Sequence, residues 1–187
     1  MLSVKFRCLP AQVTQDEAIK MFSRRMKQFR HGKFLLPTRF FIPYFLFRIE
    51  TRNAGKTATE FFAIDATTGT LDLYQFDAIP DDLTGLEEVE TTQYGATLLT
   101  ENEALAMIQE RLQRRIFQTK GFFKIDDFHL AGTFIETFYL PYWVGLYEKK
   151  QRVAIEIIDA VRGQFEGGKI HDLVREWLQA ESHHRTT

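Results

Sequence analysis

One short pattern occurs twice in this chain and strongly limits what the chain can fold into. Residues 61–72 begin as an apolar run that ends at an Asp-Ala pair, turns through Gly69 and resumes as a second apolar-alternating run. Residues 155–166 repeat this pattern in a degenerate form, with Gly163 in the turn. Two apolar runs joined by a short turn that contains glycine predict a β-hairpin at each place.

Two other landmarks recur in the same order along the chain. The sequence from Thr14 to Ile19 returns 86 residues later as the sequence from Thr100 to Leu105. The aromatic stretch 40–45, which contains Pro43, returns 98 residues later, and the hairpin pattern returns 94 residues later. Short matches in one order with small shifts in spacing predict an internal duplication. We therefore expect a first unit at residues 1–85 and a second at residues 86–187.

Each predicted unit combines a helix with antiparallel strands. Thr14 and Glu17 have the spacing of a capping box, and apolar residues follow at helical intervals. The aromatic stretches are too rich in β-formers and too broken by proline for a helix, so they are expected to be strands. Ile170 begins another amphipathic pattern near the end of the chain. The expected fold is α+β, with two tandem helix-plus-sheet units and a C-terminal helix.

The composition limits the kinds of site that the protein can contain and the compartment in which it is expected. The only cysteine among the 187 residues is Cys8, which excludes an intrachain disulfide and a cysteine-rich zinc site. The sequence shows no apolar segment typical of a signal peptide or a membrane span. We expect a cytoplasmic protein without a metal or a cofactor.

The charges are unevenly distributed although the net charge is only −1. Residues 1–56 hold 12 Lys/Arg and 3 Asp/Glu, whereas residues 57–110 hold 12 Asp/Glu and no Lys/Arg. One interpretation is a basic face on the first helix that binds nucleic acid or an anionic membrane surface. The other is an ordinary solvated face whose charges are neutralised by nearby acidic segments. The candidate basic residues are Lys20, Arg24, Arg25, Lys27 and Arg30.

The aromatic strands supply a second candidate binding site. Tyr44 and Phe45 follow Pro43 in the first half, and Tyr142 and Trp143 follow the corresponding proline in the second. These four residues could line an aromatic groove for a peptide, a lipid or a planar ligand. Alternatively they are core and interface packing, the usual role of aromatic residues at strand spacing.

Signals for catalysis are weak. His129 lies near Asp126 and Asp127, but no other group of an acid–base site converges on it in the sequence. The glycine pair before Lys169 lacks the upstream glycine of a phosphate-binding loop. Cys8 has no neighbouring activator. We therefore expect that the protein is not an enzyme and has no catalytic residues.

The capped helix and the Asp-Ala turn together resemble a known family. A helix that begins as in Thr14–Ile19, followed by a hairpin whose turn reads as in Asp65–Gly69, resembles the PepSY domain, a small cystatin-like α+β unit. The stretches Thr100–Leu105 and Asp159–Gly163 resemble it more weakly. The resemblance implies a helix against an antiparallel sheet and a non-catalytic role in interaction or inhibition.

These observations lead to two functional hypotheses. The first is a non-enzymatic module that binds an unknown protein or a small apolar ligand through aromatic strands or sheet edges, with a homodimer as one form of such an interaction. The second is a peripheral binder of nucleic acid or anionic membrane through the basic first helix.

Overall fold

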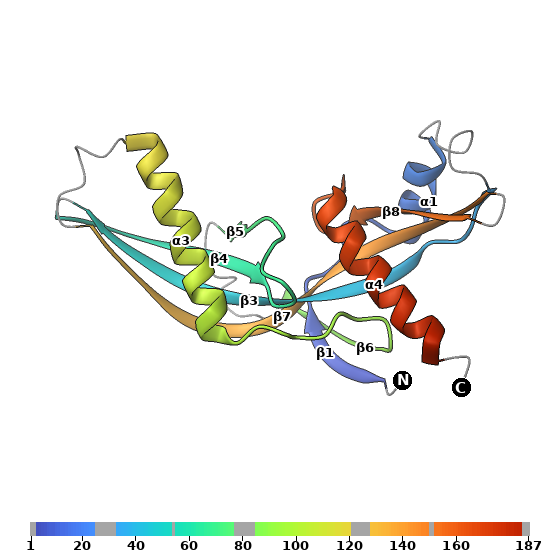
Figure 1. Cartoon of the computed structure of the whole chain (residues 1–187), viewed down its shortest axis with the longest axis horizontal. Helices are drawn as coiled ribbons and strands as arrows, with labels where there is room; N and C mark the ends of the chain where they lie inside the picture. The colour runs from blue at the N-terminus through green and yellow to red at the C-terminus, as the bar shows by residue number, and fades with distance from the viewer. Residues whose placement is uncertain are drawn as a thin grey trace. The chain divides into compact units, whose positions relative to one another are not determined.

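The structure, a computed structural model, describes residues 3–24, 33–53, 55–76, 85–120, 128–149 and 152–184. Within these ranges the chain has three helices and nine strands, and the predicted α+β class is confirmed (Figure 1). The helices are α1 (Gln15–Arg24), α3 (Glu101–Lys120) and α4 (Gly168–His184). The strands are β1 (Val4–Cys8), β2 (Lys33–Phe34), β3 (Thr38–Asn53), β4 (Lys56–Asp65), β5 (Tyr74–Phe76), β6 (Glu87–Thr91), β7 (His129–Lys149), β8 (Arg152–Asp159) and β9 (Gln164–Phe165).

The strands form one mixed sheet. Its hydrogen-bonded order is β5-β4-β3-β7-β1-β6, while β2 and β8 also pair with β7, and β9 pairs with β8. Two long antiparallel hairpins, β3–β4 and β7–β8, pair over ten and eight positions. A parallel bridge between Cys8 and Tyr139 joins β1 to β7.

The chain divides into two compact units that do not follow the predicted boundary after residue 85. Unit 1 consists of Met1–Ile42, Leu86–Gly95 and Tyr139–Thr187, and unit 2 of Pro43–Gly85 and Ala96–Phe138. Each unit thus takes segments from both halves of the sequence. Strands β3 and β7 each contribute one part to unit 1 and the other part to unit 2.

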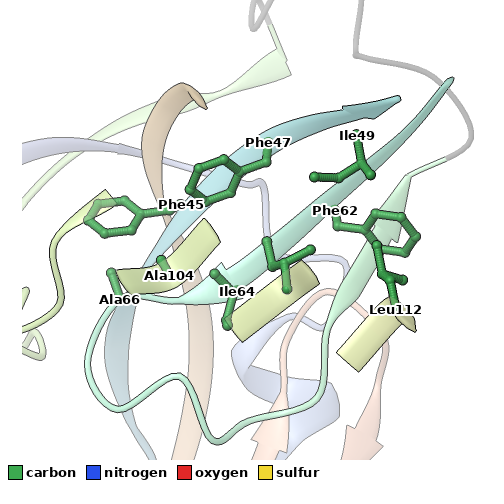
Figure 2. Close-up of a cluster of buried hydrophobic side chains, with 9 residues drawn as sticks. Phe45, Phe47, Ile49, Phe62, Ile64, Ala66, Ala104 and Leu112 are labelled. Carbon is green, nitrogen blue, oxygen red and sulfur yellow. The ribbon is translucent and has the colours of Figure 1, made fainter. Parts of the chain in front are cut away.

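The core of unit 2 shows why the units combine both halves. Helix α3, from the second half of the sequence, packs on the β3–β4 hairpin, from the first half (Figure 2). The cluster comprises Phe45, Phe47, Ile49, Phe62, Ile64, Ala66, Ala104, Ile108 and Leu112. Alternate residues of each strand face the helix, as the two-residue period of a strand requires.

The core of unit 1 is the reverse arrangement. Helix α1, from the first half, packs on the β7–β8 hairpin, from the second half. The cluster comprises Val13, Ala18, Phe22, Trp143, Tyr147, Ile158 and Ala160. The hydroxyl of Tyr147 donates to the backbone oxygen of Phe22 at 3.1 Å, and the indole N–H of Trp143 donates to that of Val13 at 2.8 Å. The apolar face of each helix is therefore buried by the hairpin of the other half.

The same local hydrogen bonds recur in the two units. The backbone N–H of Ala66 donates to the oxygen of Pro43 at 2.8 Å, and that of Ala160 donates to Pro141 at 3.0 Å. The oxygen of Ala66 then accepts from the N–H groups of residues 98 and 99, and the oxygen of Ala160 accepts from those of residues 12 and 13. These positions are related by the spacings of 86, 94 and 98 residues found in the sequence.

Both predicted capping boxes are present. The backbone N–H and hydroxyl of Thr14 donate to Glu17 at 2.8 Å, and those of Thr100 donate to Glu103 at 2.8 and 2.7 Å. The bonds from each threonine hold the pKa of the glutamate below its usual value. The cap residue thus fixes the start of each helix through groups only three residues apart.

Candidate functional site

The turn after β4 contains the most heavily bonded polar side chain of the repeated pattern. The Asp65 carboxylate is fully buried. It accepts the backbone N–H groups of Thr68, Gly69 and Leu71 at 2.8, 2.9 and 2.9 Å, and the hydroxyl of Thr67 at 2.6 Å. Because the turn's own donors surround both carboxylate oxygens, Asp65 organises the turn and has no open face for chemistry.

Helix α3 holds this turn from outside. The Arg111 guanidinium donates to the backbone oxygen of Leu71 at 2.8 Å and also to that of Gly69. Gly69 and Leu71 thus donate their N–H groups to the Asp65 carboxylate and accept from the Arg111 guanidinium with their oxygens. The turn is therefore held by both a carboxylate and a guanidinium. In unit 1, Asp159 accepts the N–H groups of Val161 and Arg162, both at 2.8 Å.

Replacing the turn glycines by alanine is expected to have unequal effects. Gly69 has φ = 66° and Gly163 has φ = 67°, a region that disfavours any side chain. A Cβ at Gly69 would also lie 2.5 Å from the Met107 sulfur, whereas at Gly163 the nearest atom, in Val13, is 3.4 Å away. We expect Gly163→Ala to cost about 1–2 kcal/mol from backbone strain. Gly69→Ala should cost about 2–4 kcal/mol, since Met107 must also move. Urea unfolding of the two variants measures the difference, and equal losses would show that Met107 moves without cost.

The four aromatic candidates are buried in the cores. Tyr44, Phe45, Tyr142 and Trp143 expose only 1%, 5%, 2% and 4% of their surface. In unit 2, Tyr44 contacts the rings of Tyr74 and Phe138, while Phe45 contacts Phe134. In unit 1, the Trp143 ring lies beneath the Arg39 guanidinium and faces α1. This burial favours the packing interpretation over a surface groove.

The basic candidates are only partly described. Lys20 and Arg24 are exposed on α1, while Arg25, Lys27 and Arg30 lie outside the described residues. The described part of α1 therefore presents two cations on its solvent side.

The remaining polar candidates do not assemble a reaction centre in the described part of the chain. His129 is exposed at the start of β7, and its predicted neighbours Asp126 and Asp127 lie outside the described residues. Within the described ranges, no three His, Cys, Asp or Glu side chains gather as a metal site would require. Burial, with a smaller contribution from Glu87, raises the pKa of the Cys8 thiol to about 11, so Cys8 stays protonated at neutral pH.

The edges of the sheet differ in how they are protected. Within the described residues, β6 ends the sheet order, and its residues Glu87, Glu88 and Glu90 are exposed. The Lys5 ammonium lies 2.5 Å from the Glu88 carboxylate. Charged residues on an outer strand oppose pairing with another strand, because pairing would bury those charges. This edge is therefore protected against association.

Part of the β4 edge, at residues 61–63, is covered by a strand of the same unit. Phe61 and Ala63 pair with Phe76 and Tyr74 of β5. The rings of β5 continue over the sheet, with Tyr74 5.9 Å from Tyr44 and Phe76 6.1 Å from Phe138 between ring centroids. Strand β5 therefore completes both the backbone bonding and the aromatic packing at this edge.

The corresponding edge of β8 has no paired strand among the described residues beyond the point where the chain leaves the sheet. Strand β9 pairs with Ile158 and Asp159, and the N–H of Glu166 donates to the oxygen of Ile157 at 2.9 Å. By the alternation of an antiparallel strand, the backbone groups of Ile155 and Val153 also face away from β7. Continued pairing would place Gly168 opposite Ile155, but α4 begins at Gly168. Among the described residues, no strand pairs with this part of the edge.

An apolar side chain marks this open edge. Val153 exposes 65% of its surface and is one of the most exposed large apolar residues described. The corresponding residue of β4, 94 positions earlier, is the exposed and polar Thr59. Sequence reasoning missed Val153, although an alignment of the two hairpins contains the signal: a polar residue on one hairpin edge and an apolar residue on the other. We take the outward backbone groups of Val153 and Ile155 as the candidate site and call it the β8 edge.

Comparisons with known proteins leave the site without a precedent. No protein family model, no curated protein and no solved structure matches this chain. In the described part of the chain, none of the helices combines the length and the apolar character needed to span a bilayer.

Proposed function

We propose that this protein is a non-enzymatic interaction module that binds an extended segment of a partner protein along the β8 edge. The observation that carries the proposal is the contrast among three sheet edges. Strand β6 is protected by glutamates, and β5 pairs with residues 61–63 of β4, whereas among the described residues no strand pairs with the corresponding Ile155 of β8, which lies beside the exposed Val153. Natural sheets usually protect their edges, so an unprotected one is a candidate for strand addition.

The proposal includes an origin for the two hairpins. We propose that the chain arose by duplication of a PepSY-like, cystatin-like unit whose copies are residues 1–85 and 86–187. The recurring capping boxes and the matching bonds of Ala66 and Ala160 support this origin. After duplication, the first copy continued from its hairpin into β5, and the second continued into α4. The loss of a covering strand in the second copy would have created the β8 edge.

Strand β5 indicates what kind of segment fits. It is an extended segment that pairs antiparallel with Phe61–Ala63, and these residues correspond to Ile155–Ile157 of β8. In unit 1, the ring of Trp177 in α4 packs on the ring of Phe40, with 4.6 Å between ring centroids. The ring of Phe76 in β5 packs on Phe138 in a similar way in unit 2. Because α4 already supplies this aromatic packing, the partner needs a backbone to pair and a small apolar residue to cover Val153.

The expected affinity is low for a short segment. Val153 and Ile155 offer up to four backbone hydrogen bonds, each worth about 1 kcal/mol net. Together with part of the Val153 surface, this only roughly offsets the cost of association, so the dissociation constant of a short peptide is expected to be in the millimolar range or weaker. A natural partner would bind more tightly through contacts beyond the edge.

A peptide titration followed by amide NMR tests the proposal. The probe is a short soluble peptide of alternating threonine and valine with a lysine at each end. We expect it to shift the amide signals of Val153, Ala154 and Ile155. We expect Val153→Pro to abolish these shifts, because proline removes an outward N–H and blocks strand addition. The fold should persist, since that N–H has no role in pairing with β7.

The matched control is Thr59→Pro, which makes the same change at the corresponding edge position of β4. It should leave peptide binding intact. A second control is the same peptide with alternate amides N-methylated, which should not bind. Binding that survives Val153→Pro, or shifts confined to the α1 residues Lys20 and Arg24, would reject the β8 edge.

A further inference from the structure

We infer that the two halves of this chain bind each other specifically even when they are separate polypeptides. A polypeptide that carries residues 1–85 is then a specific partner for one that carries residues 86–187. The inference is independent of the proposed β8 edge. It rests on the exchange of helices between hairpins, which makes each compact unit a product of both halves.

The contacts within unit 1 give the first half a defined surface on the second. Ala18 and Phe22 on α1 are fully buried in the cluster formed with the β7–β8 hairpin. The fit is close, because a Cβ built on Gly145 of β7 would lie 2.9 Å from the ring of Phe22. Strand β1 also pairs with β6 across five positions. Cutting the chain between the halves breaks none of these contacts.

Unit 2 supplies a second surface of the same kind. Ala104 and Ile108 on α3 are fully buried against the β3–β4 hairpin. Arg111 of α3 binds the backbone of the turn that follows β4. Any complex of the two halves would therefore be held at two places, one in each unit, and both would have to open before the halves separate.

Charge also favours association. Residues 1–85 hold 12 Lys/Arg against 9 Asp/Glu, a net charge of +3. Residues 86–187 hold 12 Lys/Arg against 16 Asp/Glu, a net charge of −4. Opposite net charges attract the halves and oppose pairing of two identical halves. The preferred partner of one half is thus the other half and not a second copy of itself.

Cleavage of the intact folded protein tests the inference. A recognition site for a sequence-specific protease is inserted between Gly85 and Leu86, where the two halves join. After complete cleavage, we expect both fragments to elute together from a sizing column at the volume of the uncut protein. Urea should separate them, and dilution from urea should restore the joint peak. Fragments that separate without urea, whether folded or unfolded, would overturn the inference.

Paired substitutions identify the surfaces that hold the fragments together. Ala18 and Ala104 occupy corresponding positions, 86 residues apart, and both are fully buried. Ala18→Asp combined with Ala104→Asp should separate the cleaved fragments in buffer. The control, Gln15→Asp, places the same residue at an exposed position of α1 and should leave them together. Continued joint elution of the doubly substituted protein would show that the helix faces do not carry the recognition.

Discussion

Asp65→Ala is expected to destabilise the protein by about 3–5 kcal/mol. The substitution removes the acceptor for three backbone N–H groups and the Thr67 hydroxyl. Donors left buried without an acceptor cost about 1–3 kcal/mol each when water cannot reach them, and partial access of water reduces the total. Urea unfolding followed by far-UV circular dichroism measures the loss.

Two further variants test the reason for this loss. Asp65→Asn keeps one acceptor oxygen but turns an NH₂ group toward a backbone donor, so it should lose about half as much as the alanine variant. Asp16→Ala, at an exposed position in the first turn of α1, should change stability by about 0.5 kcal/mol or less. If Asp65→Ala costs under about 1 kcal/mol, the buried carboxylate does not organise the turn.

Phe22→Ala is expected to cost about 3–5 kcal/mol, because it leaves a cavity between α1 and the β7–β8 hairpin. Gly145→Ala alone should cost about 1–3 kcal/mol, because the new methyl group would lie 2.9 Å from the Phe22 ring. In the Phe22→Ala protein the same methyl group would enter the cavity. Gly145→Ala should then be neutral or stabilising, which gives a coupling of about 1–3 kcal/mol.

This double-mutant cycle directly tests the exchange of helices. Phe22 and Gly145 lie in different halves of the sequence, so they couple only if α1 packs on β7. The control pairs Gly145→Ala with Ile108→Ala, a buried substitution on the other helix. Those two changes should add within about 0.5 kcal/mol. Additive costs for Phe22 and Gly145 would place α1 elsewhere.

The corresponding pair in unit 2 shows that the two cores take their large side chains from different elements. Phe47 of β3 corresponds to Gly145, and Ile108 of α3 corresponds to Phe22. In unit 1 the large side chain comes from the helix and the strand contributes a glycine, while in unit 2 the larger one comes from the strand. Each half of the sequence therefore has a helix fitted to the hairpin of the other half, because core volume must be matched across the surfaces that meet.

The sequence alone determined the local features of this protein. The capping boxes at Thr14 and Thr100 and the glycine turns were predicted correctly, because each depends on groups within a few residues of one another. The apolar runs likewise predicted an antiparallel strand pair at each glycine turn and the α+β class, although the strand after the first turn begins only at Tyr74. In the same way, the spacing between repeated landmarks located the positions that make equivalent bonds in the two units.

Only the tertiary structure decided which helix packs on which hairpin. The predicted division after residue 85 assumed that each helix covers its own hairpin, and a pattern of apolar residues contains nothing that excludes the exchange. An apolar stripe records that a face is buried but not what buries it. The sequence could not show either whether the aromatic candidates are buried, because the same residue types suit a groove and a core. These candidates are Tyr44, Phe45, Tyr142 and Trp143.

The candidate site depends on that tertiary information as well. Val153 is one apolar residue in an apolar strand, and its sequence environment does not show that the neighbouring edge is open. Among the described residues this edge has no covering strand, because the chain leaves the sheet at Gly168 instead of continuing opposite Ile155. The repeated Asp-Ala turn was thus found from sequence alone. The path of the chain after each turn depends on contacts between residues distant in the sequence, and the proposed binding edge rests on that path.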